Sequence, residues 1–320
     1  MKTVFALSLA LSGLCMAQPA WNIEQSNEKA GIDIDRFIGN PDNSPVHLSH
    51  GTLLYHTILR NGNPYAASGS GNVLEYRKDL SVATLLGKNK TPLVTLPDEH
   101  MFIIKSGEGR LDDGKNYWDL REGVAILAPP NVAHRFTNTS DKTLTMIMLR
   151  WTAAGTPGSQ LLVRDINQLP YCEENAHWNN TSKCIFGAAD GLFQNERMYV
   201  VMLQPWSMSA PHVHEEGVEE IWTKLTPGVA VMNIGSELRE MPENSAYLAP
   251  PTGITSHANL NLSKDKVEWW LYVARRRANP PPAANVNANA ARGGNNNNRP
   301  ANPNLSRDVQ EATVPGKPLR

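Results

Sequence analysis

Short apolar segments recur along most of this sequence and are separated by Gly, Pro, Asn and Asp. Neither half of the chain shows apolar residues at the spacing of a long amphipathic helix. Short strands bounded by turn residues are typical of all-β sandwiches and barrels. The chain has 320 residues, of which 41% are hydrophobic, and this is enough for one large or two modest cores. The sequence therefore predicts an all-β fold.

An internal repeat divides the strand-rich region into two similar halves. The segment from Glu99 to Gly107 aligns with the segment from Glu220 to Gly228. Further along, His134 aligns with His257 after a short insertion. Two similar halves predict two similar barrels in tandem.

The second half contains a set of residues that suits a metal ion. His212 and His214 are two residues apart, so in a strand both side chains point to the same face. Glu219 begins the next apolar run, and His257 lies beyond a further strand that returns beside the others if the sheet closes. Imidazole nitrogens with one carboxylate suit a divalent Fe, Mn, Ni, Cu or Zn ion rather than Mg or Ca.

The spacing of these residues resembles the two motifs of the cupin superfamily. The first motif, G-x5-H-x-H-x(3,4)-E-x6-G, is matched from His212 to Glu219, with its last glycine two residues late at Gly228. The second, G-x5-P-x-G-x2-H-x3-N, is matched between Pro251 and Asn261, with one extra residue before its histidine. The resemblance implies two cupin (double-stranded β-helix or jelly-roll) barrels, a bicupin. The metal ligands that it implies are His212, His214, Glu219 and His257.

The first half lacks most of this metal motif. In the repeat alignment, Thr91 and Leu93 replace the two histidines of the HxH pair, whereas His134 is retained. We favour His134 as a hydrogen-bonded residue of a barrel without metal, which serves as a structural partner or as a metal-free pocket. A weak metal site is the alternative, with Asp98, Glu99 or His100 as further ligands.

Other histidines and carboxylates give weaker patterns. His47, His50 and His56 lie in a turn-rich segment, and we expect them at the surface or on an edge strand. Glu215 and Glu216 directly follow the HxH pair and suit solvent-facing loop positions. One of these two carboxylates could transfer protons at the mouth of the site.

The N-terminus has the pattern of a secretory signal peptide. A basic start is followed by an apolar run from Val4 to Leu14 and by a small-residue cleavage site near Ala17. Cleavage leaves Cys172 and Cys184, which form a disulfide in an oxidising compartment, the alternative being two unpaired buried thiols. We therefore predict a secreted or periplasmic protein.

Charge and composition set further limits. A net charge of −1 gives no electrostatic basis for nucleic-acid binding, and no later stretch reaches the roughly 18 apolar residues of a membrane helix. From about Ala278 the chain is rich in Pro, Ala, Asn and Gly and is predicted to be disordered. The predicted organisation is a signal peptide (1–17), an N-terminal barrel with a degenerate metal motif (40–155), a linker with the disulfide (156–190), a metal-binding C-terminal barrel (191–277) and a disordered tail (278–320).

On a five- or six-coordinate metal, four protein ligands leave one or two coordination positions open for a small-molecule substrate. Cupins include dioxygenases, decarboxylases, isomerases, lyases and binding proteins, so the resemblance leaves the reaction open. The segment 209–211 lacks the arginine that oxalate decarboxylases usually carry there, which argues against oxalate. Our hypothesis is an oxygenase-type reaction on an aromatic or enol-like substrate, with Glu219 as ligand and general base.

Two other function classes stay open: a non-enzymatic cupin that binds a small molecule or sugar, and an oxygen-independent isomerase or lyase. Trp222, Trp269 and Trp270 could stack on an aromatic or sugar ligand, but tryptophan in a barrel more often belongs to the core. Metal content and oxygen uptake separate these classes. The sequence is also compatible with a homo-oligomer.

Overall fold

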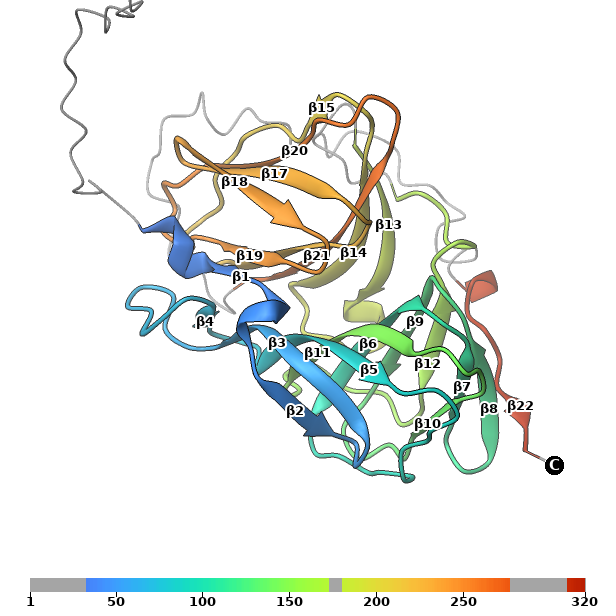
Figure 1. Ribbon diagram of the computed structural model, residues 1–320. Coiled ribbons are helices and arrows are strands. Elements are labelled where there is room, and N and C mark those ends of the chain that lie inside the picture. Colours follow the sequence, from blue (N-terminus) through green and yellow to red (C-terminus); the bar gives the residue numbers. More distant parts are fainter. Residues whose placement is uncertain (1–32, 173–179, 277–309, 320) are drawn as a thin grey trace, which may run out of the picture. The chain divides into compact units, whose positions relative to one another are not determined.

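The computed structural model describes residues 33–172, 180–276 and 310–319, and strands make up most of its regular structure (Figure 1). The strands form four sheets, two in each half of the chain. The 3-10 helices η1 (Ile34–Phe37), η2 (Pro41–Asn43) and η3 (Ala188–Asp190) are short connections. The predicted all-β fold is confirmed.

The N-terminal barrel consists of a large and a small sheet. Buried Phe102, Leu111 and Phe136 belong to the core that the two sheets share. The large sheet has the order β12 (Leu162–Asp165), β9 (Val124–Ala128), β6 (Glu99–Ser106), β11 (Leu144–Trp151), β5 (Asp79–Leu85), β3 (Leu53–Asn61) and β2 (Val46–Ser49), with β4 (Asn72–Leu74) beside β3. The small sheet has the order β10 (Arg135–Asn138), β7 (Gly109–Asp112), β8 (Asn116–Leu120) and β22 (Lys317–Pro318).

The C-terminal barrel repeats this arrangement. Its core contains Trp222, Met232, Tyr247 and Trp270, so two of the three tryptophans considered as stacking residues are core residues. The larger sheet has the order β1 (Ile38–Gly39), β19 (Ala246–Ala249), β16 (Glu219–Lys224), β21 (Glu268–Arg275), β14 (Glu196–Leu203) and β13 (Asn180–Gly187). The smaller has the order β15 (Ser207–Met208), β20 (His257–Asn261), β17 (Val229–Ile234) and β18 (Glu237–Pro242).

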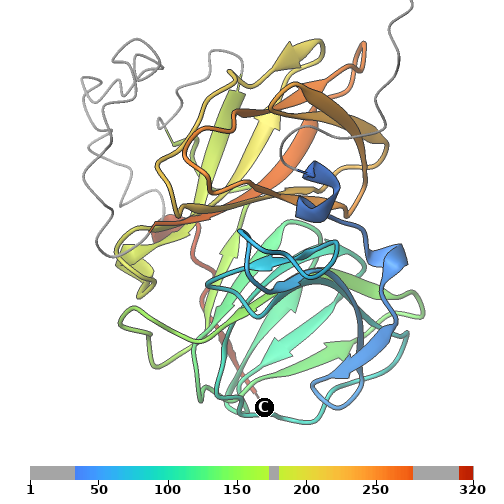
Figure 2. The ribbon, with the colours of Figure 1, turned by 90° about the vertical axis from the view of Figure 1, so that its left-hand side faces the viewer.

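Each end of the described chain adds a strand to the barrel formed by the other half. Near the N-terminus, β1 pairs with β19, and near the C-terminus β22 pairs with β8 (Figure 2). The pairing of β22 with β8 corrects the prediction of disorder for the last part of the tail, because residues 310–319 pack against the N-terminal barrel. Ala312 is buried, Val314 packs against the core, and Trp118 Nε1 donates a hydrogen bond to the Val314 carbonyl (2.9 Å). The tail residues 277–309 lie outside the described residues.

The segment 156–190, predicted as a linker, contains one strand of each barrel. β12 belongs to the N-terminal barrel and β13 to the C-terminal barrel. The predicted disulfide is confirmed: Cys172 and Cys184 are bonded, with their Cα atoms 5.9 Å apart. The predicted signal peptide lies outside the described residues. Among the residues described, no helix has the length and apolar character needed to cross a membrane.

The central strands β6 and β16 are buried on both faces. In β16, Trp222 belongs to the barrel core, while its neighbour Ile221 is buried on the opposite face. β6 has the same pattern, with Phe102 in the core and Met101 buried opposite. Successive side chains of a strand point to opposite faces. Neighbouring residues of these strands therefore enter two different buried environments.

Candidate metal centre

Four potential metal ligands converge inside the C-terminal barrel. His212 and His214 come from the loop before β16, Glu220 from β16, and His257 from the start of β20. Their ligand atoms all lie within 4.8 Å of one another. Ligands that share one metal at about 2.1 Å lie roughly 3–4 Å apart. The four groups therefore need only small shifts to hold one ion.

The backbone fixes the loop histidines against β20. His212 and His257 form an antiparallel bridge with N–O distances of 3.3 and 3.1 Å, and their ring centroids are 4.6 Å apart. The His212 Nδ1 atom donates a hydrogen bond to the Ala210 carbonyl (2.9 Å), so a neutral ring has its lone pair on Nε2. That Nε2 atom lies 3.1 Å from Nε2 of His214. A histidine whose other ring nitrogen donates to a carbonyl is typical of metal ligation.

Glu220 is the carboxylate that faces the histidines. It is fully buried, and its Oε1 atom lies 2.7 Å from His257 Nε2 and 2.6 Å from Trp222 Nε1. Its Oε2 atom lies 2.5 Å from His214 Nε2 and accepts a hydrogen bond from the Tyr272 hydroxyl (3.2 Å). Neighbours on both oxygens fix the orientation of this carboxylate.

The electrostatics of the cluster suit cation binding. Burial raises the pKa of Glu220, but the charges and hydrogen bonds of His214 and His257 outweigh burial and hold that pKa well below its ordinary value. Burial and the neighbouring His257 lower the pKa of His212 to about 4. For His214, burial lowers the pKa, but the charge and hydrogen bond of Glu220 outweigh burial and raise it. The centre thus combines an ionised carboxylate with a neutral His212, and metal binding would displace the proton from His214.

Replacing Tyr272 with phenylalanine tests the orientation of Glu220. The Tyr272→Phe variant loses one hydrogen bond to the carboxylate, and loss of such a supporting group typically weakens metal binding 10–100-fold. We expect a loss of about 10-fold, measured by competition with a chelator. Tyr117→Phe, in β8 of the other barrel, should bind metal like the unmodified protein. Equal affinities for both variants would contradict the role of Tyr272.

Glu219, the predicted ligand and general base, lies elsewhere. It points to the opposite face of β16, where its Oε1 atom is 3.1 Å from the Arg77 guanidinium. Its Oε2 atom accepts hydrogen bonds from the backbone N–H groups of Glu75 (2.5 Å) and Tyr76 (2.8 Å). Arg77 also pairs with buried Glu196. The structure therefore brings the three predicted histidines together with Glu220 and places Glu219 in a buried ion-pair cluster.

The sequence contained a signal for this difference of one residue. The first cupin motif ends on a glycine, and Gly228 comes two residues late when counted from Glu219 but only one residue late from Glu220. Both carboxylates fit a loose reading of the motif. Only the direction in which each side chain points from β16 distinguishes the two carboxylates, because a shift of one residue moves a side chain to the other face of a sheet.

The same register changes the alignment of the two repeats. Glu219 begins β16 opposite Arg275, and Glu99 begins β6 opposite Trp151. His100 therefore corresponds to Glu220. Likewise, the bridge between Val94 and His134 corresponds to that between His212 and His257, so Val94 rather than Thr91 stands in the place of His212.

Glu99 is buried, and its carboxylate is repelled by the nearby carboxylate of Glu196. Burial and the neighbouring Glu196 raise the pKa of Glu99 to about 7. A carboxyl whose pKa is raised on folding stabilises the fold below about pH 4.5, its ordinary value, and this stabilisation is lost as pH rises through 7.

A Glu99→Gln variant, which cannot ionise, should remove this pH dependence. Relative to the variant, the unmodified protein should lose up to about 3 kcal/mol between pH 4.5 and pH 7, by about 1.4 kcal/mol per pKa unit. Urea unfolding at a series of pH values measures the difference. Parallel pH profiles for the two proteins would exclude a raised pKa.

The remaining candidate residues separate into surface and buried groups. His47 is exposed on β2, whereas His50, which we expected at the surface, is buried beside His134. Glu215 is partly exposed and pairs with Arg276 at 3.2 Å, close to the HxH loop. Neither sequence spacing nor composition indicates the burial of His50.

Comparisons with known proteins agree with this architecture. Residues 87–150 match the cupin domain family. No curated protein matches the sequence significantly. Among solved structures, AerE from Microcystis aeruginosa has a TM-score of 0.57 at 14% identity, covering 75% of this chain and 100% of its own.

Two further solved structures have similar scores at lower identity. Oxalate decarboxylase from Lactobacillus farciminis, in complex with formate, has a TM-score of 0.56 at 9% identity, covering 79% of this chain and 89% of its own. Vicilin from Corylus avellana has a TM-score of 0.55 at 8% identity, and the match covers 75% of this chain and 85% of the vicilin chain. At these identities the likeness concerns the fold alone. Together with the cupin domain matched at residues 87–150 and the two barrels, it shows that the chain has the two-barrel fold of a bicupin.

Proposed function

We propose that this protein is a secreted, metal-dependent bicupin enzyme with one divalent transition metal in its C-terminal barrel. The ligands are His212, His214, Glu220 and His257, and the metal is Fe, Mn, Ni, Cu or Zn. The observation that carries this proposal is the convergence of these four groups, with ligand atoms within 4.8 Å of one another. The N-terminal sequence pattern and the disulfide between Cys172 and Cys184 support secretion.

The reaction that we propose is an oxygenase-type reaction on a small aromatic or enol-like substrate. When bound, the metal would supply a positively charged centre for a substrate oxygen and, if redox-active, a site for dioxygen. Three neutral imidazoles and one carboxylate leave a divalent ion with a net positive charge, which favours an anionic oxygen such as an enolate. Trp222 and Tyr247, which belong to the barrel core, make the surroundings largely apolar.

Access to the centre is from the side of the HxH loop. The His214 side chain is 20% exposed, whereas that of His257 is 1% exposed. Glu215 lies in the same loop, and its charge acts on His214. We assign to Glu215 the acceptance of the substrate proton, because Glu219 is held by Arg77 on the other face of β16.

Oxalate is not the proposed substrate, although an oxalate decarboxylase shares the fold. Ser209 is buried before the HxH pair, and its hydroxyl accepts a hydrogen bond from the Asn259 backbone N–H (2.8 Å). The nearby segment 209–211 has no guanidinium to hold a small diacid.

Metal analysis followed by oxygen uptake tests the proposal. The purified protein should contain Fe, Mn, Ni or Cu and consume oxygen with catechol-like or flavonol substrates, and His212→Ala should abolish this consumption. Zinc without oxygen uptake would instead favour an isomerase or lyase. A protein that retains no metal in its C-terminal barrel would refute the enzyme proposal and leave the non-enzymatic binding protein.

A further inference from the structure

Three buried histidines meet inside the N-terminal barrel, where the HxH pair is missing. His50 lies in the turn between β2 and β3, His100 in β6, and His134 just before β10. Their exposed fractions are 4%, 1% and 1%. The ring centroid of His50 lies 5.0 Å from that of His134 and 5.3 Å from that of His100. These separations are close to the 4.6–5.2 Å found among the histidines of the C-terminal centre.

Two of these histidines occupy positions equivalent to ligands of the C-terminal centre. In the register of the two barrels, His100 corresponds to Glu220, and His134 corresponds to His257. His50 has no counterpart in the HxH motif. It enters the barrel from a turn in which its own φ is 47° and that of Gly51 is 77°. A residue from a different part of the chain thus fills the place of the missing pair.

The Nδ1 atoms of the cluster have outside hydrogen-bond partners, while the Nε2 atoms of His50 and His134 are hydrogen-bonded to each other, a contact that a bound metal would replace. His134 Nδ1 donates to the Val132 carbonyl (2.9 Å), and His100 Nδ1 donates to the Asp98 carbonyl (3.1 Å). Since a carbonyl only accepts, each of these rings, when neutral, has its lone pair on Nε2. His50 Nδ1 lies 2.8 Å from the Ser49 hydroxyl, so its Nε2 atom points away from the turn.

The separation of the two nearest nitrogens is that of two ligands on one metal. His50 Nε2 lies 3.0 Å from His134 Nε2, compared with 3.1 Å between the Nε2 atoms of His212 and His214. Two nitrogens bound at about 2.0–2.1 Å with angles between 90° and tetrahedral lie roughly 2.9–3.4 Å apart. The His50–His134 pair therefore has the spacing of ligands once the proton of their hydrogen bond moves to His50 Nδ1.

The surroundings keep these imidazoles neutral. Burial, followed by the neighbouring His134, lowers the pKa of His50 to about 2 and that of His100 to about 3. Burial also lowers the pKa of His134. Phe102 and Phe136 lie against the cluster with ring centroids about 6 Å from that of His50. The neutral form is the one that binds a metal.

We propose that the N-terminal barrel binds a second metal ion through His50, His100 and His134. An all-imidazole set suits Zn²⁺, Cu²⁺ or Ni²⁺ better than Mn²⁺, and three histidines leave a fourth position for water or a small anion. His50 and His134 form the prearranged pair. His100 is the third ligand and moves inward on binding, because its ring centroid is 6.3 Å from that of His134.

Metal stoichiometry tests the second site without reference to any enzyme activity. Metal-free protein is dialysed against Zn²⁺, and the bound zinc per chain is measured together with the circular dichroism of each variant. We expect two ions in the unmodified protein, one in Glu220→Gln, one in His134→Gln and none in the double variant. One ion in the unmodified protein and none in Glu220→Gln would overturn the N-terminal site. One ion that survives Glu220→Gln but not His134→Gln would support this site while removing the C-terminal one.

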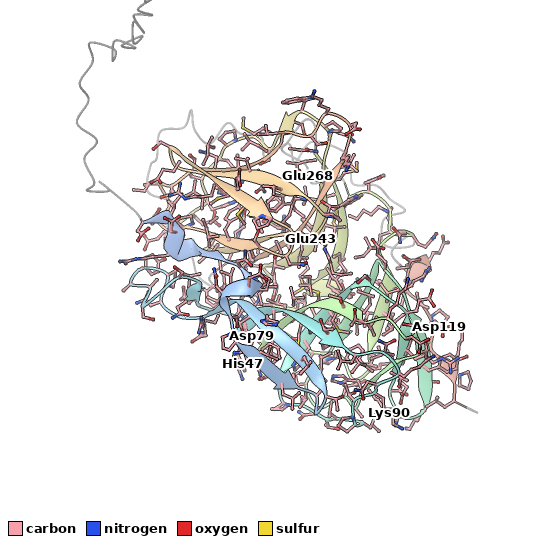
Figure 3. All side chains as sticks on the ribbon, viewed as in Figure 1. His47, Asp79, Lys90, Asp119, Glu243 and Glu268 are labelled. Carbon is pink, nitrogen blue, oxygen red and sulfur yellow. A yellow bond between two sulfur atoms is a disulfide. The ribbon has the colours of Figure 1, made fainter. Side chains whose placement is uncertain are left out.

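A second variant covers the case in which His134→Gln fails to fold. His50→Asn keeps a residue that tolerates positive φ, so the turn should form while the ligand is lost. The matched control is His47→Asn, since His47 is exposed on β2 at the periphery of the barrel (Figure 3). His50→Asn should lose one ion and His47→Asn none, and retention of both ions by a folded His50→Asn would contradict the proposal.

Discussion

Glu220→Gln should lose its C-terminal metal, whereas the adjacent substitution Glu219→Gln should keep it. Glu220 lies among the three histidines, and Glu219 is bound to Arg77 on the other face of the same strand. Removing a group that only supports a ligand weakens metal binding 10–100-fold, so loss of the carboxylate itself should cost at least about 100-fold. Chelator competition in a His134→Gln background, with zinc as the probe, isolates the C-terminal centre.

Each of these two variants serves as the control for the other, because the substitutions are identical and one residue apart. Glu219→Gln should instead lower the stability of the fold, since it weakens the buried pair with Arg77. If Glu219→Gln lost the metal and a folded Glu220→Gln retained it, the ligand assignment would have to return to the one predicted from the motif.

Arg77→Met should be one of the most destabilising substitutions in the chain. The Arg77 side chain has 0% exposure, pairs with Glu196 and Glu219, and lies 5.6 Å from the Trp151 ring. Removing one partner of a buried ion pair leaves uncompensated charge and typically costs 3–5 kcal/mol. We expect about 4 kcal/mol from urea unfolding at neutral pH, with the disulfide intact in every sample.

Two further variants identify the cause of the lower stability of Arg77→Met. Arg110→Met removes a surface pair with Asp119, in which both side chains are about half exposed, and should cost less than about 1 kcal/mol. Combining Arg77→Met with Glu196→Gln and Glu219→Gln removes the unpaired charges and should recover much of the stability. A triple variant no more stable than Arg77→Met would show that lost packing, rather than unpaired charge, causes the effect.

The sequence predicted the features that depend on local patterns. Short apolar runs between turn residues indicated strands, and the similarity of the segments at Glu99 and Glu220 indicated two barrels. The disulfide followed from two cysteines around a short polar loop. His212 and His214 were proposed as ligands from their i, i+2 spacing and His257 from the resemblance to the second cupin motif, and the three side chains converge.

The sequence failed where the outcome depends on which barrel a segment packs against. Residues 310–319 were included in the predicted disordered tail because they follow a low-complexity segment, yet Ala312 is buried and Val314 packs against the core, beside the strand pairing of β22 with β8. His50 was expected at the surface because nothing nearby in sequence explains its burial. Its neighbour in space, His134, is 84 residues away along the chain.

By itself, the sequence determined an all-β fold, its duplication, the disulfide pairing and the kind of ligands available for a metal. Only the tertiary structure decided which of two consecutive carboxylates faces the histidines, and which histidines gather in the first barrel. The physical reason is that β16 is buried on both faces. When both faces of a strand are covered, no alternation of polar and apolar residues marks the inner one. The choice between Glu219 and Glu220 then depends on the contacts that each face makes, with Arg77 on one side and the histidines on the other.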